Sequence, residues 1–208
     1  MTMAFSSLDS QLTGPLFRTE EVAAVFSDRA RLSAMLRVEA ALARVQAQAG
    51  LVSSGLADAI TALSPDDFDL ATLGRETELA GVPVIPFVKA VQKRLPRDLE
   101  RGFHFGATTQ DIADTVLALQ MRDALALLAT DLAAVMAGMA TLAERHRTTP
   151  CIGRTYLQHA APVTFGFKMA SRLAGLTEIA ARLPALKRTS LLVSLGGPVG
   201  TLTALGPQ

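Results

Sequence analysis

The sequence predicts an all-α protein, and three features point to that class. Helix start and stop signals bracket residues 27–50, residues 111–147 run without a proline, and no stretch shows the apolar–polar alternation of a β-strand. The 208 residues suffice for one domain or two small ones with a buried core. We therefore expect helices throughout, while length alone leaves the number of domains open.

The first hundred residues are predicted to form one longer helix and then several short ones. The longer helix occupies residues 27–50, where Ser27 and Asp28 give the start signal and Gly50 gives the stop. Shorter helical runs, each ended by a proline or a glycine, follow at 54–63, 67–81 and 86–95. These elements predict an N-terminal helical domain over residues 1–101.

A single long helix is predicted over residues 111–147. The stretch has one glycine, and at 1.5 Å per residue its 37 residues would extend about 55 Å. Apolar residues recur along it at spacings of three and four and form one apolar seam. The seam consists of Leu117, Met121, Ala124, Leu128, Leu132, Val135, Met139 and Leu142. Further apolar residues lie off the seam, so this helix is expected to need neighbours on several sides.

A second long helical run is predicted over residues 163–193, with Pro184 expected to kink or divide it. Two long antiparallel helices do not close a bundle by themselves. Residues 102–208 are therefore expected to be the first long helices of a larger helical bundle, which further chain or other subunits would complete.

The composition favours an oligomer and argues against several partners. Half of the residues are hydrophobic and 19% are charged, so other subunits are expected to cover apolar surface. The net charge of +1, without a basic run, argues against nucleic acid and anionic membranes. Cys151 is the only cysteine and no signal-peptide pattern is present, which predicts a cytoplasmic protein. No phosphate loop or metal-ligand spacing occurs, so neither a metal nor another cofactor is expected.

Residues 104–115, HFGATTQDIADT, form the first stretch that could carry chemistry. Thr108 with Asp111 fits a capping box and Thr109 is an alternative N-cap, so helix initiation alone would explain them. The functional interpretation is a carboxylate-binding site made of helix-start amides, the two threonine hydroxyls and His104. This stretch alone leaves both interpretations open.

Residues 153–162, GRTYLQHAAP, form the second such stretch, predicted as a turn or loop ahead of the second long helix. Arg154 offers a planar fork for a carboxylate, and Thr155 and Gln158 can add neutral hydrogen bonds. The alternative is an ion pair between Arg154 and a nearby acidic residue, with Tyr156, the only tyrosine, filling a gap.

The chain resembles the fumarase/aspartase superfamily through HFGATTQDIADT, a long helix, GRTYLQHAAPVTFG and a second long helix, in that order. Through AGVPVIPFVKAV, LQMRDAL, HRTTP and GGPVGTL it is most similar to the bacterial 3-carboxy-cis,cis-muconate cycloisomerases. The resemblance implies a small N-terminal helical domain and a five-helix bundle of the fumarase/aspartase type. It also implies a homotetramer with sites built from three subunits, and a small polycarboxylate substrate.

Residue by residue, the resemblance implies roles in one substrate site. His104 and Tyr156 are expected to be catalytic, and Asp111 is expected to be structural. The expected substrate-binding residues are Thr108, Thr109, Arg154, Thr155 and Gln158.

The implied activity is closure of 3-carboxy-cis,cis-muconate to 4-carboxymuconolactone in protocatechuate catabolism. Most superfamily lyases have a histidine where this chain has Tyr156, whereas the cycloisomerases tend to have an aromatic residue there, which favours the cycloisomerase. The family's serine-rich catalytic loop has no counterpart before Gln208, so a truncated polypeptide is expected. A fumarate-releasing lyase of the argininosuccinate or adenylosuccinate type and a non-catalytic helical fragment stay open as alternatives.

Overall fold

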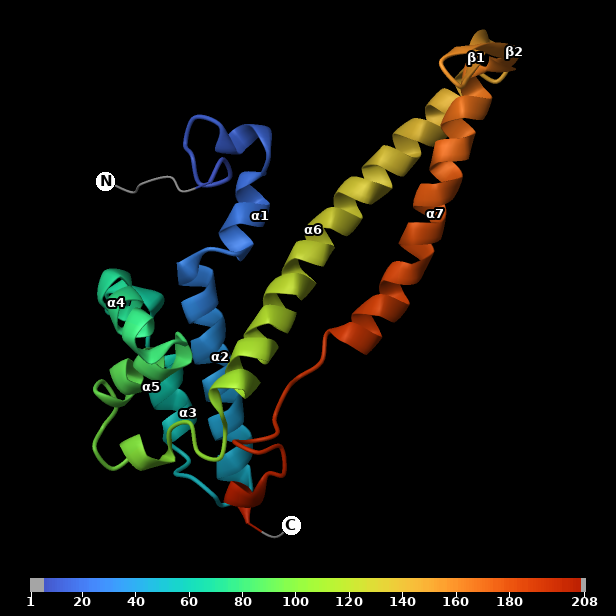
Figure 1. Ribbon diagram of the computed structural model, residues 1–208. Coiled ribbons are helices and arrows are strands. Elements are labelled where there is room, and N and C mark those ends of the chain that lie inside the picture. The colour runs from blue at the N-terminus through green and yellow to red at the C-terminus, as the bar shows by residue number, and fades with distance from the viewer. Residues whose placement is uncertain (1–5, 207–208) are drawn as a thin grey trace. The chain divides into compact units, whose positions relative to one another are not determined.

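A computed structural model describes residues 6–206 as seven α-helices, short 3-10 turns and one two-stranded antiparallel sheet (Figure 1). The predicted all-α class is confirmed, with one hairpin added. The helices are α1 (Glu20–Val25), α2 (Asp28–Gln48), α3 (Leu56–Thr61), α4 (Leu70–Ala80), α5 (Val84–Gln92), α6 (Thr109–Arg145) and α7 (Phe165–Ser190). The strands are β1 (Pro150–Thr155) and β2 (Gln158–Thr164).

The chain divides into two compact units. One contains the chain up to Asp123 together with the segment that begins at Leu191, and the other is Ala124–Ser190. The division falls inside α6. The domain boundary expected after residue 101 stays a prediction.

The core of the first unit is apolar and lies among α2, α3, α5 and the start of α6. Its largest fully buried side chains include Phe87, Leu56, Ile60 and Ile112. The ring of Phe87 packs edge-on against that of Phe103, with centroids 6.3 Å apart. This contact fixes Phe103 to the core. Phe103 directly precedes His104, where the first predicted site stretch begins.

Two helix ends in this unit follow the predicted signals, whereas α5 begins two residues before the predicted run and α1 was not predicted. Ser27 caps α2, since its hydroxyl accepts a hydrogen bond from the Ala30 amide at 3.2 Å. Helix α4 ends at Gly81, whose φ of 77° is the left-handed conformation that glycine adopts without strain.

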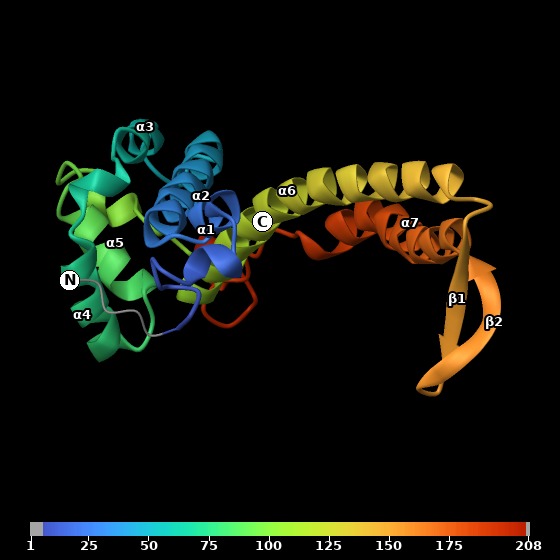
Figure 2. The same ribbon diagram turned by 90° about the horizontal axis from the view of Figure 1, so that it is seen from above.

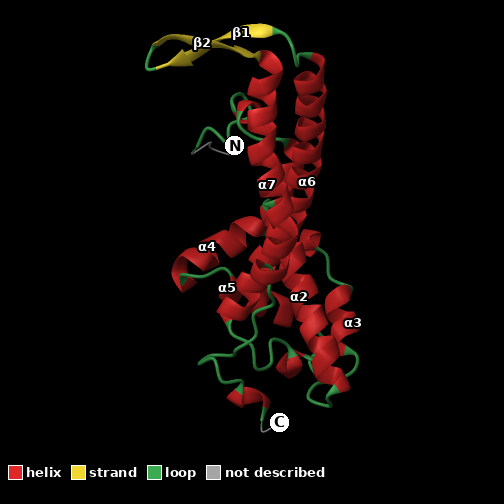
Figure 3. Cartoon of the chain, turned by 90° about the vertical axis from the view of Figure 1, so that its right-hand side faces the viewer, coloured by secondary structure: helices red, strands yellow, loops and turns green. Residues whose placement is uncertain are grey.

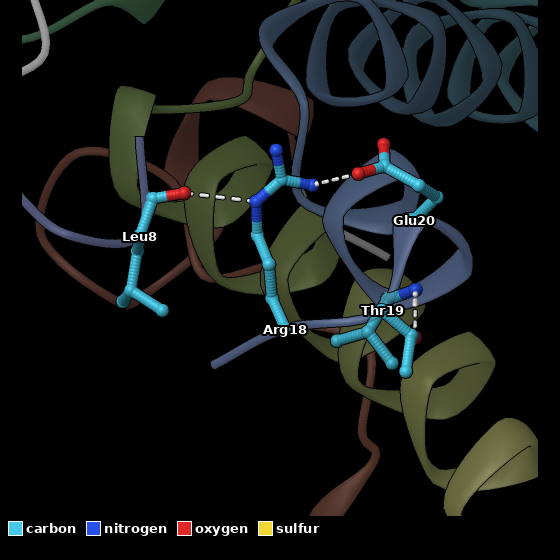
Figure 4. A network of polar contacts seen from close by, with 5 residues as sticks. Leu8, Arg18, Thr19 and Glu20 are labelled. Atoms are coloured by element: carbon cyan, nitrogen blue, oxygen red, sulfur yellow. Dashed lines mark hydrogen bonds and ion pairs between the residues drawn. The ribbon is translucent and has the colours of Figure 1, made fainter. Parts of the chain in front are cut away.

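The segment ahead of α1 is held by Arg18 (Figure 4). Its Nε donates to the Leu8 carbonyl at 2.8 Å, and its Nη1 lies 2.8 Å from Oε1 of Glu20. Thr19 caps α1 by accepting a hydrogen bond from the Val22 amide. The start of the described chain is therefore tied to the first turn of α1.

The second unit consists of the larger part of α6, the hairpin and α7 (Figures 1 and 3). Both long helices are confirmed. Pro184 lies inside α7 without dividing it. Proline has no amide N–H, so the carbonyl four residues earlier loses its helical hydrogen bond. Because Pro184 is exposed, water can take the place of this donor. A groove of about 590 Å³ runs between the two helices, lined by alanines and larger apolar residues of both and by Lys187 of α7.

The start of α7 packs closely on the end of α6. Gly166 is buried, and its amide donates to the His146 carbonyl at 2.9 Å. A Cβ at Gly166 would meet the Ala143 carbonyl oxygen and the backbone of Arg147. The absence of a side chain at this position therefore sets how closely the two helices approach.

The predicted seam of α6 faces outward along much of its length. Its exposed members are Leu117, Met121, Leu128, Val135 and Leu142. Among the described helices, α6 is also long and apolar enough to cross a membrane, with a mean hydropathy of 1.8 over 18 residues, none of them buried. A helix of this kind needs cover from outside the chain.

Candidate active site

The first predicted stretch forms a tight turn that leads into α6. Phe103 is anchored in the core, whereas His104 and Gly106 both adopt positive φ angles, of 59° and 72°. Left-handed backbone costs a residue with a side chain about 1–2 kcal/mol, although histidine is among the residues that adopt it more often. The left-handed conformation of His104 therefore indicates that the surrounding contacts hold the turn in place.

Glu39 on α2 holds the His104 ring. Oε1 of Glu39 lies 2.6 Å from Nδ1 of His104, and the two side chains are 1% and 15% exposed. Glu39 was not among the residues predicted from the sequence. The signal was present, because Glu39 follows Leu32, Met35 and Leu36 on the buried face of α2, where a carboxylate needs a partner.

Asp111 ties the start of α6 to the segment after α7. Its Oδ1 accepts a hydrogen bond from the Gly196 amide at 2.8 Å, and its Oδ2 accepts from the amides of Gly197 and Thr108 at 2.9 and 3.0 Å. Burial raises the pKa of Asp111, but the three amides, with the nearby His104, outweigh burial and hold the pKa below its ordinary value of 3.8. The expected structural role of Asp111 is confirmed by these bonds.

The two threonines occupy successive positions at the start of α6. The Thr108 carbonyl accepts from the Ile112 amide and α6 begins at Thr109, so Thr108 is the N-cap and the alternative N-cap at Thr109 is wrong. Both side chains are half-buried. His104, Thr108 and Thr109 thus lie together beside the first-turn amides, which have no partner within the helix. This turn can bind an anion.

The second predicted stretch is a β-hairpin, so its prediction as a loop is wrong (Figure 2). Thr155 pairs with Gln158, which leaves Tyr156 and Leu157 as a two-residue turn. The pairing register shifts around Gly153, which removes the alternation that predicts a strand. Pro162 lies in β2, where it is tolerated because both strands of a two-stranded sheet are edges.

The hairpin presents its polar residues to solvent. Arg154 pairs with His159 and Thr155 with Gln158, so the first pair lies on one face of the hairpin and the second on the other. Tyr156 is 95% exposed and therefore fills no gap. In the part of the chain described here, no ion pair forms at Arg154. The alternative of a packed tyrosine and a paired arginine is wrong for this chain.

The turn residues of the hairpin are strained. Tyr156 and Leu157 have φ angles of 44° and 63°, in the region that two-residue hairpin turns require and that asparagine and glycine normally supply. We expect Leu157→Gly to be more stable than Leu157→Ala by roughly 0.5–1 kcal/mol, because both remove an exposed side chain but only glycine relieves the backbone. Urea unfolding of both variants measures the difference, and equal stabilities would contradict the strain.

The predicted residues therefore form two groups. His104, Thr108 and Thr109 belong to the first unit, whereas Arg154, Thr155, Tyr156 and Gln158 belong to the second. A cavity of about 740 Å³ in the first unit borders Asp111 but none of these seven residues. Among residues 6–206, no three histidine, cysteine or acidic side chains are grouped as a metal site would require.

Comparison with known proteins places the chain in a family. The model of a family described as lyase matches residues 17–208. The chain belongs to this lyase family. Its fold is that of the fumarase/aspartase superfamily.

Two curated members of the lyase family illustrate the range of activities. A 3-carboxy-cis,cis-muconate cycloisomerase of Pseudomonas aeruginosa is 44% identical over 203 residues, which cover 96% of this chain and 44% of that protein. A nitrosuccinate lyase of Streptomyces davaonensis is 41% identical over 199 residues, covering 94% of this chain and 42% of that protein.

A solved member of the lyase family has the same fold. The crystal structure of a 3-carboxy-cis,cis-muconate lactonizing enzyme from Pseudomonas putida superposes with a TM-score of 0.91 at 43% identity. The match covers 95% of this chain and 46% of that one. The chain therefore spans less than half the length of each of these three proteins.

Proposed function

We propose that this protein is a cycloisomerase that converts 3-carboxy-cis,cis-muconate to 4-carboxymuconolactone in protocatechuate catabolism. The observation that carries the proposal is the 44% identity with a cycloisomerase over 96% of the chain. The Pseudomonas putida structure supports it. Tyr156 supports it as well, because the resemblance to the superfamily implies a histidine at this position in most of the lyases.

The chemistry of ring closure suits the two predicted groups of residues. A substrate carboxylate adds to the conjugated double bond, a C–O bond forms, and the neighbouring carbon takes up one proton. The nucleophile is already an anion at neutral pH, so no protein base is needed for the attack. Negative charge moves into another carboxyl group of the substrate, where Arg154, the threonines and the α6 amides would stabilise it. His104 is the proposed proton donor.

Assembly into a homotetramer and a cytoplasmic location belong to the same proposal. The exposed seam of α6 and the exposed hairpin tip support an assembly, because both present apolar or strained residues that this chain does not cover. The single cysteine, Cys151, supports a reducing compartment. In such an assembly, the two groups of site residues could come from different subunits.

A fumarate-releasing or related lyase is the second candidate, favoured by the 41% identity with a nitrosuccinate lyase. The full-length protein should be assayed in parallel for loss of muconate absorbance and for fumarate release from argininosuccinate and adenylosuccinate. We expect absorbance loss alone. Fumarate release without absorbance loss would favour the lyase, and no turnover by a folded tetramer would favour a non-catalytic scaffold.

Tyr156 is proposed to hydrogen-bond the substrate. A tyrosine hydroxyl can donate a hydrogen bond to a substrate carboxylate. Tyr156→Phe is therefore expected to lower kcat/KM roughly tenfold, the effect of one lost hydrogen bond to a charged group. Steady-state kinetics measure it, with Leu157→Ala at the neighbouring turn position as the control. A Tyr156→Phe variant with unchanged kcat and KM would leave the hydroxyl without this role.

A further inference from the structure

The contact between Glu39 and His104 specifies which ring nitrogen carries a proton. A carboxylate accepts hydrogen bonds and cannot donate them, so the 2.6 Å contact from Glu39 Oε1 favours the proton on Nδ1 of His104. Nε2 is then the ring nitrogen that is available to interact with a substrate. It has a lone pair when the ring is neutral and an N–H when the ring is charged.

The burial of Glu39 limits the partners that its carboxylate can bind. Glu39 is 1% exposed, so water does not compete for its oxygen, and an unpartnered carboxylate at this position would be strongly destabilising. Asp111 on α6 is the other acidic group close enough to interact with His104. Its two oxygens are already bonded to three backbone amides. Glu39 is therefore the group that orients the ring.

A second buried side chain of α2 holds the backbone of the same turn. Nε2 of Gln46 donates to the Phe105 carbonyl at 2.7 Å. Glu39 and Gln46 are seven residues apart, which places them on one face of α2 two turns from each other. Gln46 thus restrains the main chain, whereas Glu39 restrains the ring. The two functions can be separated by mutation.

We propose that Glu39 is a positioning residue, which fixes the Nδ1–H tautomer of His104 and leaves Nε2 to face a substrate bound at the start of α6. The role toward substrate rests on the proposed function. The tautomer does not, because it follows from the contact within the chain. Carboxylates fix a histidine tautomer in this way in sites where the other ring nitrogen accepts or donates a proton.

Nitrogen-15 NMR of the histidine side chains tests the tautomer without any substrate. The sequence has three histidines, so the His104 signals can be assigned by their loss in His104→Gln. In the wild-type protein, at a pH where the ring is neutral, we expect Nδ1 to carry the proton and Nε2 to have the shift of an unprotonated nitrogen. A proton on Nε2 of His104 in the wild-type protein would overturn the proposal, and this measurement does not depend on any Glu39 variant.

Glu39→Gln tests the role of the charge. A glutamine side chain has nearly the same shape but can either accept from or donate to Nδ1, so we expect the His104 signals to shift toward a mixture of tautomers. Gln46→Ala, which loosens the turn without touching the ring, is expected to keep the wild-type tautomer. An unchanged tautomer in Glu39→Gln, or the same mixture in both variants, would contradict a positioning role.

Kinetics separate this inference from the proposed function. If the wild-type protein closes the lactone, Glu39→Gln should lower kcat roughly tenfold or more, with a smaller change in KM, since proton transfer rather than binding is affected. An unchanged kcat would remove the catalytic part of the proposal. If the wild-type protein does not turn over muconate while the NMR result holds, the proposed function fails and the assignment of Glu39 to His104 stands.

Discussion

Replacing Asp111 by alanine is expected to lower the free energy of unfolding by about 3–5 kcal/mol. Asp111 is 4% exposed, and its carboxylate accepts hydrogen bonds from three backbone amides. Alanine would leave these donors in a site that water reaches poorly, and each unsatisfied buried donor is destabilising by about 1–3 kcal/mol. One of the three, the bond from the Thr108 amide, is the contact that a capping box makes at the start of α6. Urea unfolding followed by circular dichroism measures the change.

Asp114→Ala is the matched control for this prediction. Asp114 lies one turn further along α6, is exposed, and contacts Gln110 on the same helix, so its loss should change stability by less than about 1 kcal/mol. Acid provides a second readout. The pKa of Asp111 is held below 3.8 by the three amides, so its stabilisation is present above that pH and is lost as pH falls further. Asp111→Asn should lose this part of the acid dependence, and an unchanged acid profile would contradict the assignment.

Gly166→Ala is expected to destabilise the protein by about 3 kcal/mol, because overpacking against backbone cannot be relieved by a side-chain rotation. The added Cβ would lie 2.8 Å from the Arg147 amide nitrogen and closer still to the Ala143 carbonyl oxygen. Helix α7 would have to move away from the end of α6, which would weaken the 2.9 Å hydrogen bond from the Gly166 amide to His146. Thermal unfolding followed by circular dichroism measures the loss.

Gly175→Ala on the same helix separates packing from helix propensity. A Cβ at Gly175 meets no atom within 4 Å, so the substitution should stabilise α7 by up to about 1 kcal/mol. Opposite signs for the two glycines are therefore expected. If Gly166→Ala were also neutral or stabilising, the close approach of α6 and α7 described above would be wrong.

Local sequence rules predicted most of the helices. Capping residues such as Ser27, stop signals such as Gly81, and the proline-free run before Arg145 act over a few residues, so they can be read without knowing the fold. These rules did not predict the hairpin, because its register shifts near Gly153 and its turn has Tyr156 and Leu157 instead of asparagine and glycine. Pairing between strands decided its structure.

The candidate site was predictable where its residues are adjacent in the sequence. His104, Thr108 and Asp111 fall within one turn and the helix that follows, and the capping pattern already linked two of them. Glu39 was missed because 65 residues separate it from His104, and only tertiary packing brings the two together. The bonds from Gly196 and Gly197 to Asp111 span a similar separation and were missed for the same reason.

Proton NMR of a reaction mixture tests the proposed lactone closure most directly. The full-length protein is incubated with 3-carboxy-cis,cis-muconate in deuterated buffer, with the Tyr156→Phe variant in a parallel sample. We expect the olefinic signals of the substrate to be replaced by those of 4-carboxymuconolactone, with one deuteron at the carbon beside the new C–O bond and slower conversion in the variant. The proposal would be contradicted if the wild-type protein left the substrate spectrum unchanged and, in a separate sample, released fumarate from a succinate-type substrate.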